Sequence, residues 1–390
     1  MRVAEEFRSR HDADPEAVAS APGRVNLIGE HLDYNGGPVL PMALDRRTYV
    51  AAGPRRDGLL VVESLQQEGA VQVPFADLDS DRVDGWAAYV AGVLWALDTR
   101  LPGLTVLVDG QVPLGAGLSS SAALECAVAL AACSVEGRSV PREEVVAACV
   151  RAENEYAGAA TGSMDQTIAM FGELDRALLV DFGDSSRRQV PWTPAGELLV
   201  IDTKVHHELT DGGYEARRRA CEAAAAELGL AKLAAASAEN LDRLQDLEQK
   251  SRARHVVTET ARVHDAVAAL EAEEWGRFGQ LLVGSHESLR DDFEVSCAEL
   301  DVAVEAALEA GAVGARMTGG GFGGSAIALL EPGTASRVKE AVTAAFEQRG
   351  FHAPEFLDLP RAGTGATLHE ARDAARDDDR DDDRYDHGGG

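Results

Sequence analysis

The chain has 390 residues and a formal net charge of −29, from 37 Lys and Arg against 66 Asp and Glu. This acidity argues against a nucleic-acid-binding protein, which needs a basic face, and against docking on an anionic membrane surface. A hydrophobic fraction of 45% is sufficient for an ordinary globular core, and the length favours two domains.

The start of the chain and its cysteines point to the cytoplasm. Met1–Phe7 is charged and lacks the apolar stretch of a signal peptide, and no apolar run reaches the roughly 20 residues of a membrane-spanning helix. The five cysteines are scattered and form no C-x-x-C pair. We therefore expect a cytoplasmic protein with free thiols and no zinc site.

The first part of the chain is predicted to alternate short strands with helices. Apolar runs bounded by Gly and Pro favour strands, and apolar residues at helical spacing favour helices. We predict helices over 1–20, 84–98, 119–133 and around 142–157, and strands over 48–52, 59–64, 70–73 and 104–108.

The second part is mainly helical. We predict a buried strand over 198–202, helices within 214–310, a strand over 325–330 and a helix over 334–348. This mixture predicts an α+β fold of two lobes with mixed and antiparallel sheets. We place the lobes at residues 1–180 and 181–368, followed by an acidic disordered tail over 369–390.

A dense polar run over residues 21–37 is the first candidate site. It places one Arg, two carboxylates, one His and one Tyr beside four glycines. Such a cluster is costly to bury unless every polar group has a partner, and a small polyhydroxylated ligand supplies partners. The run therefore indicates a substrate pocket, with Arg24, Glu30, His31, Asp33 and Tyr34 as its polar residues.

A Gly/Ser segment over residues 113–125 is the second candidate site. Gly115 and Gly117 let the backbone turn tightly, and three serines (119–121) then open a predicted helix. A helix N-terminus suits a phosphate, and Ser hydroxyls can donate to it or ligate Mg²⁺. The alternative is a Ser-capped helix after a glycine turn. The segment is not a Walker A loop, because no Gly-Lys-Ser/Thr follows.

A glycine-rich segment over residues 319–324 formally matches G-x-G-x-x-G. A dinucleotide motif should open a helix, whereas a strand-like run follows here. We interpret the segment as backbone that lets another loop or a ligand come close.

Two acids are candidates for chemistry. Asp165 lies in a small-residue loop, where it could take a proton from a sugar hydroxyl or orient that hydroxyl. Glu153, on the preceding helix, is a candidate metal ligand. The alternative is that each acid is solvated or caps a helix. His206 and His207 would point to opposite faces of a strand, so they cannot share one metal ion there.

The segment that follows these histidines offers one further candidate. Tyr214 could reach a substrate hydroxyl. The three arginines after it, residues 217–219, are expected to pair with the acidic surface rather than to bind a ligand.

Three of these motifs resemble those of the galactokinases, within the GHMP small-molecule kinase superfamily. Residues 23–35 resemble the galactokinase signature, residues 113–123 the superfamily ATP loop, and residues 317–324 the third superfamily motif. The resemblance implies the two-lobed GHMP fold with the active site in the cleft between the lobes. It also implies ATP- and Mg²⁺-dependent phosphorylation of galactose at its anomeric hydroxyl, in the Leloir pathway. We expect a monomer.

The resemblance also implies roles for individual residues. Asp165 matches the catalytic Asp, and Arg24 matches the Arg that contacts it and the transferring phosphoryl group. Whether Asp165 removes the proton or mainly orients the hydroxyl stays open. The remaining implied roles are sugar binding by Glu30, His31, Leu32, Asp33, Gly162 and Tyr214, nucleotide binding by Ser64, Gly115, Ala116, Gly117, Leu118, Ser119, Ser120 and Ser121, and Mg²⁺ binding by Ser121 and Glu153.

Two departures and two alternatives accompany this hypothesis. Leu32 stands where many members carry Thr, and residues 206–213 differ from the pattern common before the Tyr. The chain could instead phosphorylate a related sugar, such as N-acetylgalactosamine, arabinose or galacturonate, although Glu30 and Asp33 would repel a uronate. It could also be a sensor that binds galactose and ATP without turnover, but Arg24, Asp165 and a complete Gly/Ser loop disfavour this.

Overall fold

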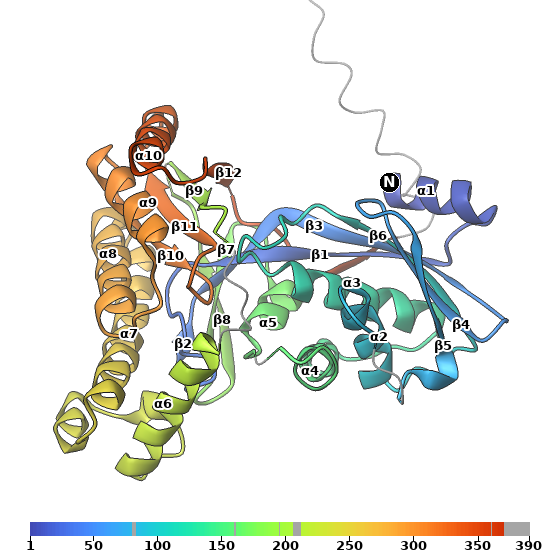
Figure 1. Cartoon of the computed structure of the whole chain (residues 1–390), viewed down its shortest axis with the longest axis horizontal. Helices are drawn as coiled ribbons and strands as arrows, with labels where there is room; N and C mark the ends of the chain where they lie inside the picture. Colours follow the sequence, from blue (N-terminus) through green and yellow to red (C-terminus); the bar gives the residue numbers. More distant parts are fainter. Residues whose placement is uncertain (80–82, 160, 195, 206–211, 360, 370–390) are drawn as a thin grey trace, which may run out of the picture.

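The computed structural model describes the chain except residues 80–82, 160, 195, 206–211, 360 and 370–390. Its strands form two sheets that lie side by side in two lobes (Figure 1), so the predicted α+β fold is confirmed. Among the described residues, no helix combines the length and the apolar character needed to cross a bilayer. The expectations for His206, His207 and the acidic tail from residue 370 concern residues outside the described part.

The first sheet is mixed. Its main order is β13, β1, β3, β6, β4 and β5, where β4 and β6 are parallel, and β7 pairs with β2, β3 and β8. Its strands within the described chain are β1 (Ala17–Asn26), β2 (Pro38–Val39), β3 (Pro41–Pro54), β4 (Leu59–Ser64), β5 (Ala70–Pro74), β6 (Leu104–Gly110), β7 (Arg176–Asp181), β8 (Ser186–Pro191) and β13 (Thr367–His369).

Helices cover both faces of this sheet. The Ala-rich α3 packs closely against β1 and β3, because small side chains let a helix approach a sheet, while α1 lies on the opposite face (Figure 1). The helices of this lobe are α1 (Arg2–His11), α2 (Ala87–Ala96), α3 (Ser120–Val135), α4 (Arg142–Arg151) and α5 (Met164–Phe171).

The prediction of one helix over residues 1–20 is wrong in its second half. The helix ends at His11, and β1 begins at Ala17. β1 is buried along its whole length: Ala19 contacts the core beneath α3, and Val18 packs in the core that includes Phe7 of α1. Pairing with two neighbouring strands and burial on both faces outweigh the helix propensity of the alanines.

The second sheet is antiparallel throughout, in the order β10, β11, β9 and β12. Helices α8 and α9 pack against β10, and α7 packs along α8 (Figure 1). The elements of this lobe are β9 (Glu197–Asp202), α6 (Gly213–Leu228), α7 (Leu247–Glu271), α8 (Trp275–Asp291), α9 (Ala298–Glu309), β10 (Gly314–Thr318), β11 (Ser325–Leu330), α10 (Ala335–Arg349) and β12 (Glu355–Leu359).

The chain does not pass from one sheet to the other at a single point. Both β8 and β13 follow residue 180 but pair within the first sheet. The division at residues 180 and 181 therefore stays a prediction for the lobes, because the first sheet contains strands from both sides of it.

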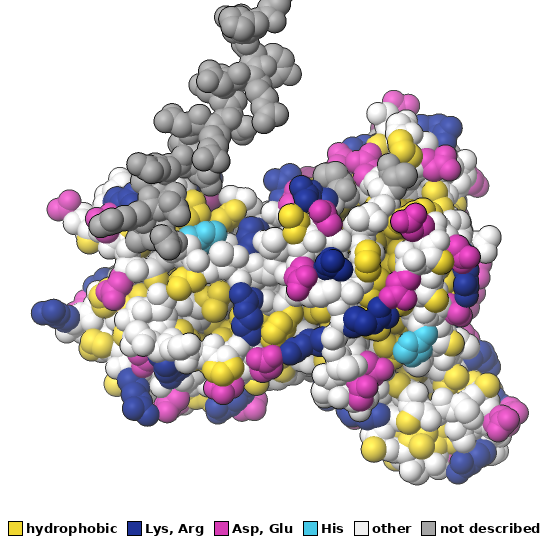
Figure 2. All heavy atoms as spheres, turned by 180° about the vertical axis from the view of Figure 1, so that it is seen from behind, with side chains coloured by type: hydrophobic (Ala, Val, Ile, Leu, Met, Phe, Trp, Pro, Cys, Tyr) yellow, Lys and Arg dark blue, Asp and Glu magenta, His cyan; other side chains and the backbone are white. Residues whose placement is uncertain are grey.

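The charged surface is mixed in sign. Figure 2 shows Lys and Arg side chains interspersed with Asp and Glu side chains over the face seen from behind. The arginines at the start of α6 pair with acids, as predicted: Arg217 with Glu248 and Glu294, Arg218 with Glu222, and Arg219 with Glu215.

Candidate active site

Arg24 and Asp165 form the centre of the site. Arg24 lies on β1, and Asp165 lies in the first turn of α5. The guanidinium donates two hydrogen bonds to the carboxylate, from Nε to Oδ1 and from Nη2 to Oδ2, each at 2.9 Å. Because this pairing is bidentate, it fixes both the position and the orientation of the Asp165 carboxylate.

The Gly/Ser segment forms a tight turn that leads into α3. Gly115 and Gly117 have φ of +72° and +70°, a region that favours glycine. Arg24 holds this turn, since its backbone N–H donates to Leu118 O at 3.0 Å and its guanidinium donates to Gly117 O. The N-terminus of α3, whose first N–H groups have no partner within the helix, therefore lies beside the Arg24–Asp165 pair.

The serines of this segment have different partners. Ser119 donates its hydroxyl hydrogen bond to Asp165, and Ser121 donates to Glu153 at 2.9 Å. Ser120 is the first residue of α3. The segment therefore contacts both acids that the sequence singled out.

Glu153 is buried on a π-helical turn (Ala152–Tyr156) that continues α4. Besides Ser121, Thr161 donates to its carboxylate at 2.8 Å and the Gln166 amide donates at 2.6 Å. Burial raises the pKa of Glu153, and these hydrogen bonds oppose the rise. These three donors satisfy the buried carboxylate, whose oxygens are of the type that hard cations prefer.

Asp33 and Gly162 approach each other closely. A Cβ atom added at Gly162 would lie 1.6 Å from Asp33 Oδ2, so only glycine leaves room for this carboxylate. Burial raises the pKa of Asp33 to about 6, and the nearby negative charge of Asp165 adds to the rise. Asp33 thus lies beside the segment that carries Asp165.

His31, Tyr34 and Tyr214 form an aromatic cluster. The ring centroids of His31 and Tyr214 are 5.4 Å apart, and those of Tyr34 and Tyr214 are 5.6 Å apart. His31 Nδ1 hydrogen-bonds to the Tyr34 hydroxyl at 2.9 Å, whereas its buried Nε2 has no hydrogen-bond partner among the described residues. Burial lowers the pKa of His31 to about 3, so its ring is neutral at neutral pH. A neutral imidazole with one free nitrogen can bind a hydroxyl group.

Glu30 is almost fully buried where the two lobes meet. Its carboxylate accepts from Asn26 Nδ2 at 2.8 Å and from Gly319 N at 3.0 Å. The Arg316 guanidinium lies 2.5 Å from the same group. Glu30 therefore joins the polar run to β10 and the glycine-rich segment, and its sugar-binding role stays a prediction.

The side chains of Leu32 and Ser64 do not contact this group. Leu32 is fully buried in the hydrophobic core, and its backbone bonds to Gly29 and Gly37 within the loop. Ser64 ends β4, where its hydroxyl donates to Gln66 Oε1 at 3.2 Å and its backbone pairs beside Val108 of β6. Their predicted roles stay predictions.

The glycine-rich segment over residues 319–324 packs on the Gly/Ser turn, which agrees with the prediction that its backbone lets another loop come close. A Cβ atom at Gly319, where φ is +86°, would lie 3.2 Å from Gly117 O. Ser325, just after the segment, donates its hydroxyl to Ala116 O at 2.7 Å. The three motifs therefore meet around one site, although they are far apart in the sequence.

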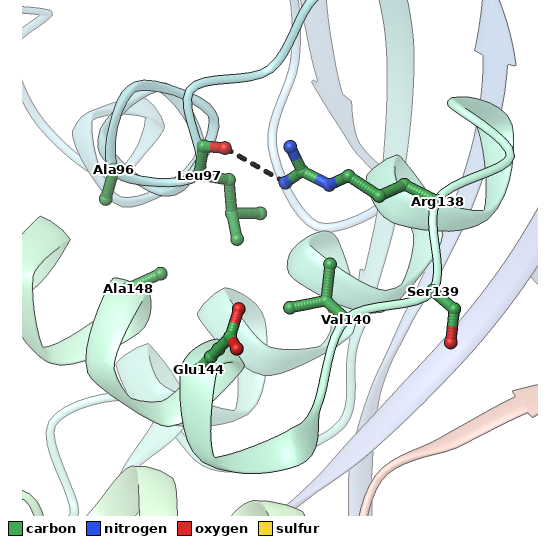
Figure 3. Close-up of a pocket in the computed structure, with 7 residues that line it drawn as sticks. All are labelled: Ala96, Leu97, Arg138, Ser139, Val140, Glu144 and Ala148. Carbon is green, nitrogen blue, oxygen red and sulfur yellow. Dashed lines mark hydrogen bonds between the residues drawn. The ribbon is translucent and has the colours of Figure 1, made fainter.

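Two surface cavities lie away from this site. One of about 280 Å³ lies between α2 and α4, where Arg138 donates to Leu97 O above Val140 and Glu144 (Figure 3). Another of about 770 Å³ lies beside α1 and the end of β3. Neither is lined by a predicted site residue.

Comparison with known proteins identifies the family of the chain. Residues 5–54 match the galactokinase galactose-binding signature, residues 88–173 the GHMP kinases N-terminal domain, and residues 266–348 the GHMP kinases C-terminal domain. Mevalonate kinase shares the fold, with a TM-score of 0.64 at 15% identity over 89% of this chain and 99% of that one. The fold and the site together define a small-molecule kinase of the GHMP type.

The most similar proteins narrow this class. The chain is 46% identical to a Streptomyces coelicolor galactokinase, over 93% of this chain and 97% of that protein. It is 44% identical to human galactokinase, over 84% and 87%. A Lactococcus lactis galactokinase solved with galactose superposes with a TM-score of 0.89 at 32% identity, covering 94% of this chain and 98% of that one. The chain belongs to the galactokinase family and is an ATP-dependent sugar kinase.

Two buried polar residues at this site, Gln166 and Glu125, were not predicted to have a role. The Gln166 amide, next to Asp165, donates both to Glu153 and to Glu125 Oε2, the latter at 3.0 Å. Burial raises the pKa of Glu125 well above its usual range. A charged or amide residue inside an otherwise apolar helix is the signal that points to such groups, but it does not name their partners.

Proposed function

We propose that this kinase transfers the γ-phosphoryl group of ATP to the anomeric hydroxyl of D-galactose, giving galactose 1-phosphate and ADP. The observation that carries the proposal is the Arg24–Asp165 pair. The Asp33 carboxylate lies against Gly162, three residues before Asp165, and Ser119 at the N-terminus of α3 donates a hydrogen bond to Asp165. Phosphoryl transfer needs this arrangement, because its catalysis depends on positioning and charge neutralisation.

In this proposal Asp165 binds the anomeric hydroxyl. It either accepts the proton as the bond to phosphorus forms or holds the hydroxyl in line for attack. Arg24 keeps the carboxylate in place and offers positive charge to the transferring group. The side chain of Asp165 is 25% exposed and that of Arg24 is 8% exposed. A substrate can therefore contact the Asp165 carboxylate, while the Arg24 side chain is buried beside it.

The residues around Ser121 and Glu153 fit a magnesium ion. They supply a hydroxyl and a carboxylate 2.9 Å apart at the end of the phosphate-binding turn. Mg²⁺ commonly takes one or two protein oxygens and completes its shell with phosphate oxygens and water. When bound, the ion neutralises charge on the nucleotide phosphates. Gly115 to Ser120 would hold those phosphates through backbone N–H groups and hydroxyls.

The sugar would be held by groups of different hydrogen-bonding character. Asp33 and Glu30 accept, the Tyr214 phenol donates, and the neutral His31 ring can do either at Nε2. The glycine at position 162 leaves room for the Asp33 carboxylate, which would accept from a sugar hydroxyl. These complementary groups suit hydroxyls in fixed directions, as on one face of a hexose.

We further propose that the protein acts as a monomer in the cytoplasm. The five cysteines are free, and four of them are buried, which suits a reducing compartment. Light scattering of the purified protein checks the assembly, and a mass twice that of the chain would contradict it.

A panel assay with Mg-ATP and purified protein tests the proposed reaction. We expect turnover on galactose that exceeds turnover on N-acetylgalactosamine, arabinose and galacturonate. Preferred turnover on another sugar would assign the enzyme to that substrate. Tight binding of galactose and ATP without ADP formation would contradict the proposed reaction and would indicate a sensor instead.

A further inference from the structure

A buried ion pair joins the two lobes behind the proposed sugar site. Arg316 lies on β10, and its side chain is 0% exposed. Its Nη2 is 2.5 Å from Glu30 Oε2, on the loop after β1, and the Glu30 side chain is 2% exposed. Arg316 lies outside the motifs predicted from the sequence, and it has no part in the proposed mechanism.

Glu30 has little freedom to reorient within this pocket. Gly319 N and Asn26 Nδ2 donate to its two oxygens at 3.0 and 2.8 Å. Thr318 has one hydroxyl hydrogen and two acceptors in reach, Asn26 O at 3.0 Å and Glu30 Oε1 at 3.2 Å. When Thr318 donates to Asn26 O, one lone pair of Glu30 Oε1 is left for a ligand hydroxyl.

Arg316 is the positive partner of this carboxylate. Burial raises the pKa of Glu30, and the charge of Arg316 is the largest effect that opposes the rise. A buried carboxylate that loses its cationic partner becomes protonated or reorients toward solvent. Either change alters the acceptor that Glu30 presents.

The backbone around Glu30 is held from the same lobe. Arg316 Nη1 donates to Leu27 O at 2.9 Å. On α7, Glu259 accepts from Gly29 N at 2.9 Å, and His255 hydrogen-bonds to Glu30 O at 3.2 Å. Residues of the second lobe therefore fix the loop on both sides of Glu30.

We infer that Arg316 is a positioning residue for sugar binding: it holds the Glu30 carboxylate and the Leu27 backbone in the arrangement that the sugar requires, without touching either substrate. This rests on the proposed function. Gly319, three residues after Arg316, donates to Glu30 and packs on the Gly/Ser turn. The end of β10 therefore contacts both the polar run that contains Glu30 and the proposed phosphate-binding turn. Arg316 thereby supports sugar affinity rather than the chemical step.

Steady-state kinetics and calorimetry of a variant set test this inference. The set comprises Arg316→Lys, Arg316→Met, Glu30→Gln and the double variant Glu30→Gln/Arg316→Met. Arg252→Met is the matched control, because Arg252 is also buried, at 3% exposure, but bonds to Glu248, Asp292 and Glu294. Wild-type turnover on galactose, measured alongside, tests the proposed function separately.

We expect the KM for galactose to rise about tenfold in Arg316→Lys and about a hundredfold in Arg316→Met, since hydrogen bonds to a charged group carry effects of this size. The KM for ATP should change less than about twofold, and kcat less than about threefold. In the Glu30→Gln background, Arg316→Met should add little, because both changes act through one carboxylate. Arg252→Met should lower the unfolding temperature and leave both KM values unchanged.

Other results would contradict the proposed role of Arg316 or the proposed substrate. Arg316 variants that lower only kcat and the unfolding temperature would make Arg316 a structural residue and overturn the inference, as would additive effects in the double variant. If Arg316→Met does not fold, Arg316→Lys and its galactose affinity by calorimetry decide the question. If the wild-type enzyme has no activity on galactose but phosphorylates another sugar, and the Arg316 variants change the KM for that sugar as expected here for galactose, the proposed substrate is overturned and the role of Arg316 is kept.

Discussion

Ser119 occupies the N-cap position of α3, yet its hydroxyl donates to the Asp165 carboxylate instead of accepting from the helix N–H groups. The residue has φ of +57°, a conformation that L residues with a side chain rarely adopt. A cap bond would stabilise the helix, and its absence leaves the first N–H groups of α3 available to a phosphate. The conformation of Ser119 therefore favours the arrangement of the site and lowers the stability of the N-terminus of α3.

Replacement of Ser119 should reduce kcat through Asp165. Without the hydroxyl, one charged hydrogen bond is lost, and Asp165 keeps its hydrogen bonds to Arg24. We expect both Ser119→Ala and Ser119→Gly to lower kcat by about tenfold or more, with the KM for galactose little changed. Ser119→Gly should be the more stable of the two, because glycine adopts positive φ without strain.

Ser185 provides the control for this backbone effect. It also has a positive φ, of +61°, but it is exposed in the turn between β7 and β8. Ser185→Ala and Ser185→Gly should shift the unfolding temperature in the same order and leave kcat unchanged. Full activity in both Ser119 variants would show that the hydrogen bond to Asp165 plays no part in turnover.

Replacement of Asp165 separates its two possible roles. Asn keeps the shape and can still accept a hydrogen bond from the sugar, but it cannot take a proton. If Asp165 is the base, Asp165→Asn and Asp165→Ala should both lose about a hundredfold or more of kcat. If it mainly orients the hydroxyl, Asp165→Asn should keep clearly more activity than Asp165→Ala.

A circular dichroism spectrum and the unfolding temperature control for folding in this experiment. Galactose affinity by calorimetry should stay within a few-fold, because other groups hold the sugar. Near-normal turnover by Asp165→Asn would contradict the whole assignment of the catalytic centre.

The sequence predicted the site where its residues lie in short local motifs. Arg24, Asp165 and Ser121 were predicted as site residues from the residue types around them, and the helices predicted over residues 119–133 and 334–348 agree with α3 and α10 to within a few residues. What the sequence could not supply is the partner of each group. That Ser119 faces Asp165, 46 residues away, depends on how α5 packs against α3.

Arg316 shows the same limit more clearly. β10 is short and carries a charged residue in its centre, so neither alternation nor an apolar run marks it as a strand. Its burial is compensated by Glu30, 286 positions earlier in the chain. Interactions between distant segments, rather than local propensity, decide such positions. The same holds for β1, whose burial on both faces overrides a helical composition.

Substitution of Gly162 should displace Asp33. In Gly162→Ala the new methyl group would overlap the Asp33 carboxylate, although the backbone itself accepts alanine. A misplacement of about 1 Å in a binding group can reduce activity about a hundredfold, and we expect this loss in kcat/KM for galactose. The KM for ATP should not change. Gly276→Ala is the control, because Gly276 lies in α8 with open space around it.

In that control, alanine should raise stability slightly and leave the kinetics unchanged, since glycine is a poor helix residue. If Gly162→Ala binds galactose normally, Asp33 is either not a sugar ligand or has room to move.

Removal of the Glu153 carboxylate should raise the requirement for magnesium. Glu153→Gln keeps the size of the side chain and its bond to Ser121 but removes the negative charge. We expect the half-saturating Mg²⁺ concentration at saturating ATP to rise about tenfold or more, because Mg²⁺ prefers carboxylate oxygens. Glu155→Gln, on the same turn but 60% exposed, is the control and should behave as wild type. An unchanged magnesium requirement in Glu153→Gln would place the ion elsewhere.

Asp33 should make sugar binding depend on pH. Burial raises its pKa to about 6, whereas the unfolded chain titrates at about 4. Stability contributed by the protonated form is therefore fully present below about pH 4 and is lost as the pH rises through 6. Asp33→Asn should consequently raise the unfolding temperature at pH 7, and this gain should disappear below about pH 4.

Bound sugar should favour the ionised form of Asp33 over the protonated form, because the sugar hydroxyls donate hydrogen bonds to the ionised carboxylate. Binding should then lower the pKa of Asp33 and release a proton near pH 6. The KM for galactose should be constant above about pH 7 and should rise by up to about tenfold per pH unit below 6, as for one coupled proton. Asp33→Asn should bind galactose weakly at every pH and lose this dependence. Calorimetry in two buffers of different ionisation enthalpy measures the proton directly, and its absence at pH 6 would remove Asp33 from the sugar site.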